Sequence, residues 1–174
     1  MFVRGVERSG RLLSIGLVLC LLGACGSEVG GTAQQASGQD GLFDPCKEVP
    51  AAAIESVGLD PSTADPGIEI TSQKACEWTG PWYFFGILSR RESIDEIKGN
   101  VKFSGFESLK VGDRSGVQFH SASDQNMERC FVALPANGGS IWLSVSTKTG
   151  DISEEPTCPL TVTYVRSLEE FLPR

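Results

Sequence analysis

The hydrophobic pattern divides the chain into a short apolar front and a longer mixed remainder. The front is the run from Leu12 to Leu22, which is eleven residues long, and it follows Arg4, Arg8 and Arg11. A helix that crosses a hydrocarbon core needs about 20 residues, so this run is too short to span. A positive segment followed by a short apolar run is typical of a secretory signal peptide.

Beyond the front, apolar and polar residues alternate in several segments, which predicts β-strands. The pattern is clean in "SGVQFH", where Val117 and Phe119 share one face. It is also clear in "RCFVALPANGGSIWLSVST", which predicts a hairpin about a turn at 135–139. The other predicted strands are residues 68–78, 82–89 and 106–109.

Helical segments are predicted near each end of this region and once between strands. Pro50 suits a first helical turn, and Ser93 suits the N-cap of a short helix at 93–100. Apolar residues recur at helical spacing within 160–172. We therefore predict an α+β fold, with a mostly antiparallel sheet of five to six strands and short helices packed on one face.

The apolar front ends in Leu22-Gly23-Ala24-Cys25, which resembles the bacterial lipobox. The resemblance implies a lipoprotein signal peptide over residues 1–24 and a diacylglycerol on Cys25. The membrane is then the first partner, reached through a lipid anchor at the extracytoplasmic face of the cell membrane. Two or three acyl chains, as in such lipoproteins, are enough for stable anchoring. An ordinary secretory signal and a single transmembrane anchor are the alternatives.

Composition predicts a tether behind the anchor and an acidic domain behind the tether. Residues 25–42 are rich in Gly, Ser, Ala, Gln and Thr, which favours a flexible linker over a buried irregular arm. Residues 43–174 are left as a single domain. The whole chain has a net charge of −7, and removal of the signal makes it about −9. An acidic protein of this kind is not expected to bind nucleic acid.

Four cysteines remain in the predicted domain: Cys46, Cys76, Cys130 and Cys158. An even number in an exported protein predicts two disulfides, and the spacing alone leaves all three pairings open. Cys46 is expected to precede the first helix, and Cys158 the last. A zinc site would need closely spaced ligands, but the domain has no CxxC pair and a single histidine. We expect no metal and no cofactor.

These features together resemble a known family. Asp44-Pro45-Cys46, the strand with Cys76-Glu77-Trp78 and two later cysteines before a C-terminal helix follow a lipobox and a tether. The chain is similar in this respect, over 43–173, to the actinobacterial lipoproteins grouped as domain of unknown function 3558. The resemblance implies the pairs Cys46–Cys76 and Cys130–Cys158. It implies no activity, and Val49 stands where the family usually has a Ser/Thr helix cap.

Catalytic patterns are absent from the sequence. His120 is the one histidine, and it falls on the opposite strand face from Val117 and Phe119, where an exposed position is expected. No serine lies in a GxSxG elbow, and no glycine-rich loop has phosphate-binding spacing. The acidic pairs are adjacent in sequence, so their side chains are expected to point apart. We therefore predict that the protein is not an enzyme.

Aromatic residues are the better lead to a binding site. Trp78, Trp82 and Tyr83 crowd one region, and alternation places Trp82 and Phe84 on one strand face, with Tyr83 and Phe85 on the other. One set is expected in the core, and the other is a candidate ligand surface. The predicted function is a binding or adaptor module of the cell envelope, whose partner is an unknown envelope protein or a glycan. The alternative is a small-molecule or glycan-binding lipoprotein with an aromatic-lined pocket.

Overall fold

The computed structural model describes residues 41–67, 70–124, 126, 128–148 and 156–174. The predicted signal peptide, Cys25 and the tether up to residue 40 lie outside the described residues. All described residues belong to one unit, Thr32–Arg174. Within it Leu42 is already buried, with 3% of its surface exposed, one residue before the predicted start of the domain.

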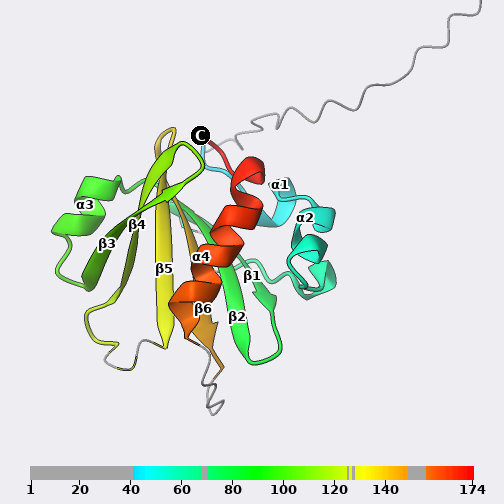
Figure 1. Cartoon of the computed structure of the whole chain (residues 1–174). Helices are drawn as coiled ribbons and strands as arrows, with labels where there is room; N and C mark the ends of the chain where they lie inside the picture. Colours follow the sequence, from blue (N-terminus) through cyan, green and yellow to red (C-terminus); the bar gives the residue numbers. More distant parts are fainter. Residues whose placement is uncertain (1–40, 68–69, 125, 127, 149–155) are drawn as a thin grey trace, which may run out of the picture. The chain divides into compact units, whose positions relative to one another are not determined.

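Six antiparallel strands form one sheet in the order β1-β2-β6-β5-β4-β3 (Figure 1). They are β1 (Gln73–Thr79), β2 (Tyr83–Arg90), β3 (Phe103–Val111), β4 (Arg114–Ser121), β5 (Arg129–Ala136) and β6 (Gly139–Thr147). The sheet confirms the predicted fold class. The hairpin turn is tighter than predicted, because Ala136 already pairs with Gly139 across Asn137-Gly138, a sequence that favours two-residue turns.

Strand β3 is longer than the predicted segment 106–109. A register shift between Ser104 and Glu107 interrupts its pairing with β4, and Gly105 adopts a φ of +66° there. Such a bulge disrupts the two-residue period of a strand. Periodicity therefore shows only the part of β3 that follows the bulge.

The helices differ from prediction at the two ends of the domain. The first predicted helix is preceded by one further turn, α1 (Pro45–Glu48), and is itself α2 (Ala51–Ser56). The others are α3 (Ile94–Gly99), α4 (Thr157–Leu168) and the 3₁₀ turns η1 (Pro61–Thr63) and η2 (Glu169–Phe171). Cys46 precedes α2 as predicted, although it lies inside the additional turn α1. Cys158 lies inside the first turn of α4, so the expectation that it precedes the last helix was wrong. Proline is tolerated in a first helical turn, so Pro45 and Pro159 do not end these helices.

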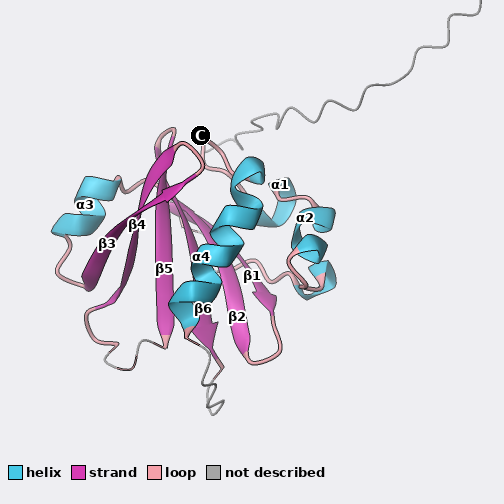
Figure 2. Cartoon of the chain, viewed as in Figure 1, coloured by secondary structure: helices cyan, strands magenta, loops and turns pink. Residues whose placement is uncertain are grey.

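One face of the sheet is covered by α1, α2 and α4 (Figure 2). Helix α4 packs across β5 and β6, and α1 packs against β1 and β2. The buried side chains of this first face include Ile54 of α2, Phe85, Leu143 and Val165. Burial of this apolar area is the main stabilising contribution of the helices.

The second face carries a smaller, aromatic cluster. Its buried residues are Ile97, Val117, Phe119, Phe131, Ala133 and Trp142. Ile97 comes from α3, so this short helix packs on the second face, whereas the other three helices cover the first. A capping box fixes the start of α3: Ser93 Oγ accepts from the Glu96 amide, and the Glu96 carboxylate accepts from the Ser93 amide.

Two disulfides join the terminal segments to the sheet. Cys46–Cys76 ties α1 to β1, and Cys130–Cys158 ties β5 to α4, with Cα atoms 5.1 Å and 5.0 Å apart. Both are the pairs that the family resemblance implies. Each bridge closes a loop of about 30 residues, with sequence separations of 30 and 28.

Candidate functional site

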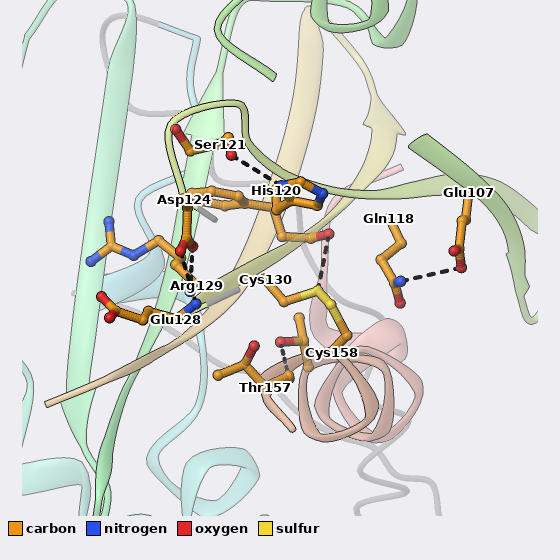
Figure 3. The surroundings of a disulfide bond; sticks show 12 residues. Glu107, Gln118, His120, Ser121, Asp124, Glu128, Arg129, Cys130, Thr157 and Cys158 are labelled. Atoms are coloured by element: carbon orange, nitrogen blue, oxygen red, sulfur yellow. Dashed lines mark hydrogen bonds between the residues drawn. A yellow bond between two sulfur atoms is a disulfide. The ribbon is translucent and has the colours of Figure 1, made fainter. Parts of the chain in front are cut away.

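The surroundings of the Cys130–Cys158 disulfide contain the only histidine of the chain (Figure 3). His120 lies directly opposite Cys130 in the β4–β5 register. Its Nδ1 donates to the main-chain oxygen of Ser121 at 3.0 Å, and Ser104 Oγ lies 3.4 Å from the same nitrogen. The ring is half-buried, so the expectation of an exposed histidine was wrong.

The β3 bulge explains the burial of His120. A Cβ atom built on Gly105 would lie 2.3 Å from His120 Nε2, so the imidazole rests on bare backbone. This packing places Nε2 of the ring against the Gly105 backbone of β3. The recorded hydrogen bonds of the ring, among the described residues, are to a hydroxyl and a main-chain oxygen, without a carboxylate to orient it.

The predicted aromatic residues do not form a common exposed surface. Trp78 and Tyr83 belong to the core, with 3% and 5% of their surfaces exposed, and the Tyr83 hydroxyl is hydrogen-bonded to that of Tyr164. Trp82 is half-buried and lies just before β2, with its ring edge-on to Tyr83 at 4.8 Å. Because Trp82 is outside the strand, it does not follow the alternation that the sequence suggested.

A different set of side chains meets on the second face, where the described helices leave the sheet uncovered. We call this set the open strip. It consists of Glu77 on β1, Phe84 on β2, Arg129 on β5, and Ser144 and Ser146 on β6. Helix α3 packs farther along the same face, near β3 and β5.

Strand register brings the open strip together in two adjacent rows. Glu77 pairs with Gly86, which pairs with Ser144. Phe84 pairs with Ser146, which pairs with Arg129. Partners in adjacent strands have side chains roughly 5 Å apart on the same face, so these residues from four strands share one surface.

Glycine and serine form the floor of the open strip. A Cβ atom on Gly86 would lie 3.0 Å from Ser144 Oγ, so the serine hydroxyl uses the space that the glycine leaves. Ser144 and Ser146 are each 6% exposed. Arg129 Nη2 donates to Ser146 Oγ at 3.2 Å, which holds the guanidinium along the strip.

Charges of both signs border this polar floor. Burial raises the pKa of the Glu77 carboxyl above its usual range, Arg129 opposes that rise, and Asp65 adds to it. On the other side Lys148 Nζ lies 5.6 Å from the centre of the Phe84 ring and donates to the main-chain oxygens of Gly80 and Pro81. The strip therefore offers a carboxylate, a planar cation and one aromatic ring to a partner, above two buried serine hydroxyls.

Sequence reasoning missed the open strip. Its residues come from four strands that are as much as 69 positions apart, and no local motif connects them. The one readable signal was "SVST" at the end of β6, where serines alternate with buried residues such as Val145. Alternation of this kind marks a face but does not say which other strands contribute to it.

The described residues contain neither a membrane-spanning helix nor a metal-ligand cluster. None of their helices combines the length and the apolar character that a membrane crossing requires. Within the same part of the chain, no group of three or more His, Cys, Asp or Glu side chains is placed to hold a metal ion.

The fold and the bridges define a small α+β domain with a six-stranded antiparallel sheet and two disulfides. The chain belongs to the family described as "Protein of unknown function (DUF3558)", whose model matches residues 20–170. Comparison with curated proteins and with solved structures gives no match. The family assignment confirms the resemblance drawn from the cysteine-containing motifs.

Proposed function

We propose that the protein is an exported lipoprotein, held by Cys25 at the extracytoplasmic face of the cell membrane, that acts by binding an envelope protein. The open strip carries this proposal. It combines charged, hydroxyl and aromatic groups on a sheet face that the described helices leave uncovered, a composition that suits a polar protein interface. No step of catalysis is assigned to it.

Two further observations support export and anchoring. The lipobox-like Leu22-Gly23-Ala24-Cys25 lies at the end of a signal-like front. Two disulfides in a domain of this size are typical of proteins that fold in an oxidising compartment. Both observations favour the same side of the membrane.

A flat interface is favoured over an aromatic-lined pocket. Trp78 and Tyr83 are buried in the core, and three cavities in the described part of the chain are lined by residues other than these two or Trp82. A protein partner is therefore the first candidate, and a glycan is the alternative outcome of the test.

Site-specific photo-crosslinking in intact cells tests the binding proposal. A photoreactive phenylalanine analogue replaces Phe84, which is half-buried at the border of the open strip. We expect a discrete protein adduct from this position. Arg129→Ala in the same chain should reduce the yield roughly tenfold, because a charged hydrogen-bonding group contributes about 1.5–3 kcal/mol.

The matched control places the same analogue at Val101, which is 91% exposed in the loop between α3 and β3. Equal adducts from positions 84 and 101, or a yield that Arg129→Ala leaves unchanged, would contradict a specific interface at the strip. An adduct with carbohydrate alone would replace the protein partner by a glycan.

A further inference from the structure

A groove lies between α3 and the strands beside it, away from the open strip. It has a volume of about 530 Å³, and its lining includes Ile94, Lys98, Leu109, Lys110, Ser115 and Pro135. Small-molecule sites usually have volumes of about 300–1,000 Å³. The groove therefore has room for a small organic ligand.

The local sequence explains how α3 forms one wall. Ile97 is fully buried in the aromatic cluster of the second face, and the capping box at Ser93 fixes the first turn. Ile94 and Lys98 are four positions apart, so they lie on one side of the helix. The helix thus presents an apolar side chain and an ammonium group to the same groove.

The opposite wall repeats this combination of apolar and cationic groups. Lys110 pairs with Ser115 in the β3–β4 register, and both line the groove together with Ser108. Pro135 of β5 provides apolar surface, whereas the Leu109 side chain packs against the buried cluster of the first face. Each wall therefore supplies one lysine, and two serine hydroxyls lie on the side of β3 and β4.

The charge of the groove is opposite to that of the chain. Its two ionisable lining residues are both lysines, although the chain has a net charge of −7. Among the described residues the ion pairs involve other cations, and none is recorded for Lys98 or Lys110. Both side chains are exposed, so their ammonium groups are available to a ligand.

We propose that this groove binds a small organic anion whose carboxylate or phosphate lies between Lys98 and Lys110 and whose ring or short chain packs on Ile94 and Pro135. Two ammonium groups and the hydroxyls match an anionic head, and the apolar walls match the remainder of the ligand. The site shares no residue with the open strip, so its test is independent of the protein interface proposed there.

Equilibrium dialysis of the full chain in lipid nanodiscs, against empty nanodiscs, tests the proposal. The probes are benzoate and phenyl phosphate, which separate a carboxylate from a phosphate. We expect at least one of them to bind, and the double variant Lys98→Ala/Lys110→Ala to bind it at least about tenfold more weakly, because two attractive charges are lost. Lys102→Ala removes an exposed lysine that does not line the groove and should leave binding unchanged.

Two further probes test the two halves of the proposed ligand. Benzylammonium, which has the ring but the opposite charge, and inorganic phosphate, which lacks the ring, should both bind at least about tenfold more weakly. Circular dichroism and a thermal melt confirm that each variant is folded. The proposal is overturned if neither aromatic anion binds, if the double variant binds like the parent, or if either control probe binds equally well.

Discussion

Arg114 joins three parts of the chain through one guanidinium. Its Nη2 donates to the main-chain oxygens of Pro135 and Pro173, and its Nη1 lies 3.7 Å from Glu169 Oε1. The residue is only 8% exposed. Burial lowers the pKa of this group, and Glu169 opposes the shift, so the charge is retained by its partners. These contacts hold the first residue of β4 against Glu169 of η2 and against Pro173.

Removal of Arg114 should therefore be costly. We expect Arg114→Ala to lower the free energy of unfolding by about 3 kcal/mol, because two part-buried hydrogen bonds to main-chain oxygens and the ion pair with Glu169 are lost. Arg174→Ala is the matched control. Arg174 pairs with the same Glu169 oxygen at 3.2 Å, but its side chain is 68% exposed, so its loss should cost at most about 1 kcal/mol. Equilibrium denaturation measures the free energy of unfolding of both variants. Equal losses would contradict a stabilising role of the Arg114 contacts.

Glu77 makes the stability of the domain depend on pH. Burial raises the pKa of its carboxyl in the folded state above the usual value near 4.5. The folded state therefore holds this proton more tightly than the unfolded state. The resulting stabilisation is present at acidic pH and is lost as the pH rises from about 4.5 through the raised pKa.

The comparison of parent and Glu77→Gln isolates this effect. The stability of the parent minus that of the variant should fall as the pH rises across that interval, since glutamine does not ionise. Denaturant titrations at a series of pH values provide the measurement. A difference that is constant with pH, or that grows as the pH rises, would show that the carboxyl is not destabilised by burial.

At the scale of elements, the terminal helices depend on the bridges. The Cys130–Cys158 disulfide fixes the first turn of α4 to β5. We expect the double variant Cys130→Ala/Cys158→Ala to lose about 3–4 kcal/mol of unfolding free energy, as the chain-entropy model gives for a loop of this length. Chemical denaturation measures the loss, and a change below about 1 kcal/mol would contradict it.

The second bridge is the internal control for that prediction. Cys46–Cys76 has a sequence separation of 30, against 28 for Cys130–Cys158. The chain-entropy model therefore predicts nearly equal losses for Cys46→Ala/Cys76→Ala and for the other pair. If the two losses of unfolding free energy differ greatly, the bridges act on the folded state, where α4 packs on β5 and β6, rather than on the entropy of the unfolded chain.

Elements whose signals are local could be predicted from the sequence. The capping box of α3 and the β5–β6 hairpin both follow from short motifs. The start of α4 at Thr157 could not, because the helical spacing begins only at Leu160, where Thr161, Val162 and Thr163 also weaken the helix propensity. Burial of residues such as Thr161, Val165 and Leu168 against the sheet overrides that weakness.

The candidate site was less accessible to sequence reasoning than the fold. Trp78, Trp82 and Tyr83 were the predicted ligand-binding residues, but the structure buries Trp78 and Tyr83 in the core. Glu77, Arg129 and Ser144 become neighbours only through the register of four strands. Such long-range pairing has no local signature, since each strand by itself specifies only which residues share a face.

At the scale of the whole molecule, the disulfides and the sequence before the domain both favour an exported protein. The disulfides suit an oxidising compartment, and the sequence before the domain suits export and lipid attachment. The open strip and the α3 groove lie on a domain that Cys25 would hold to the membrane. Attachment through this lipid requires Cys25 to be the first residue of the mature protein.

Mass spectrometry of the protein isolated from membranes, digested without reduction, tests this requirement most directly. We predict an N-terminal peptide that begins at Cys25 and carries a diacylglyceryl group, together with linked peptides for Cys46–Cys76 and Cys130–Cys158. An N-terminus elsewhere, an unmodified Cys25 or free thiols at the four domain cysteines would contradict the account.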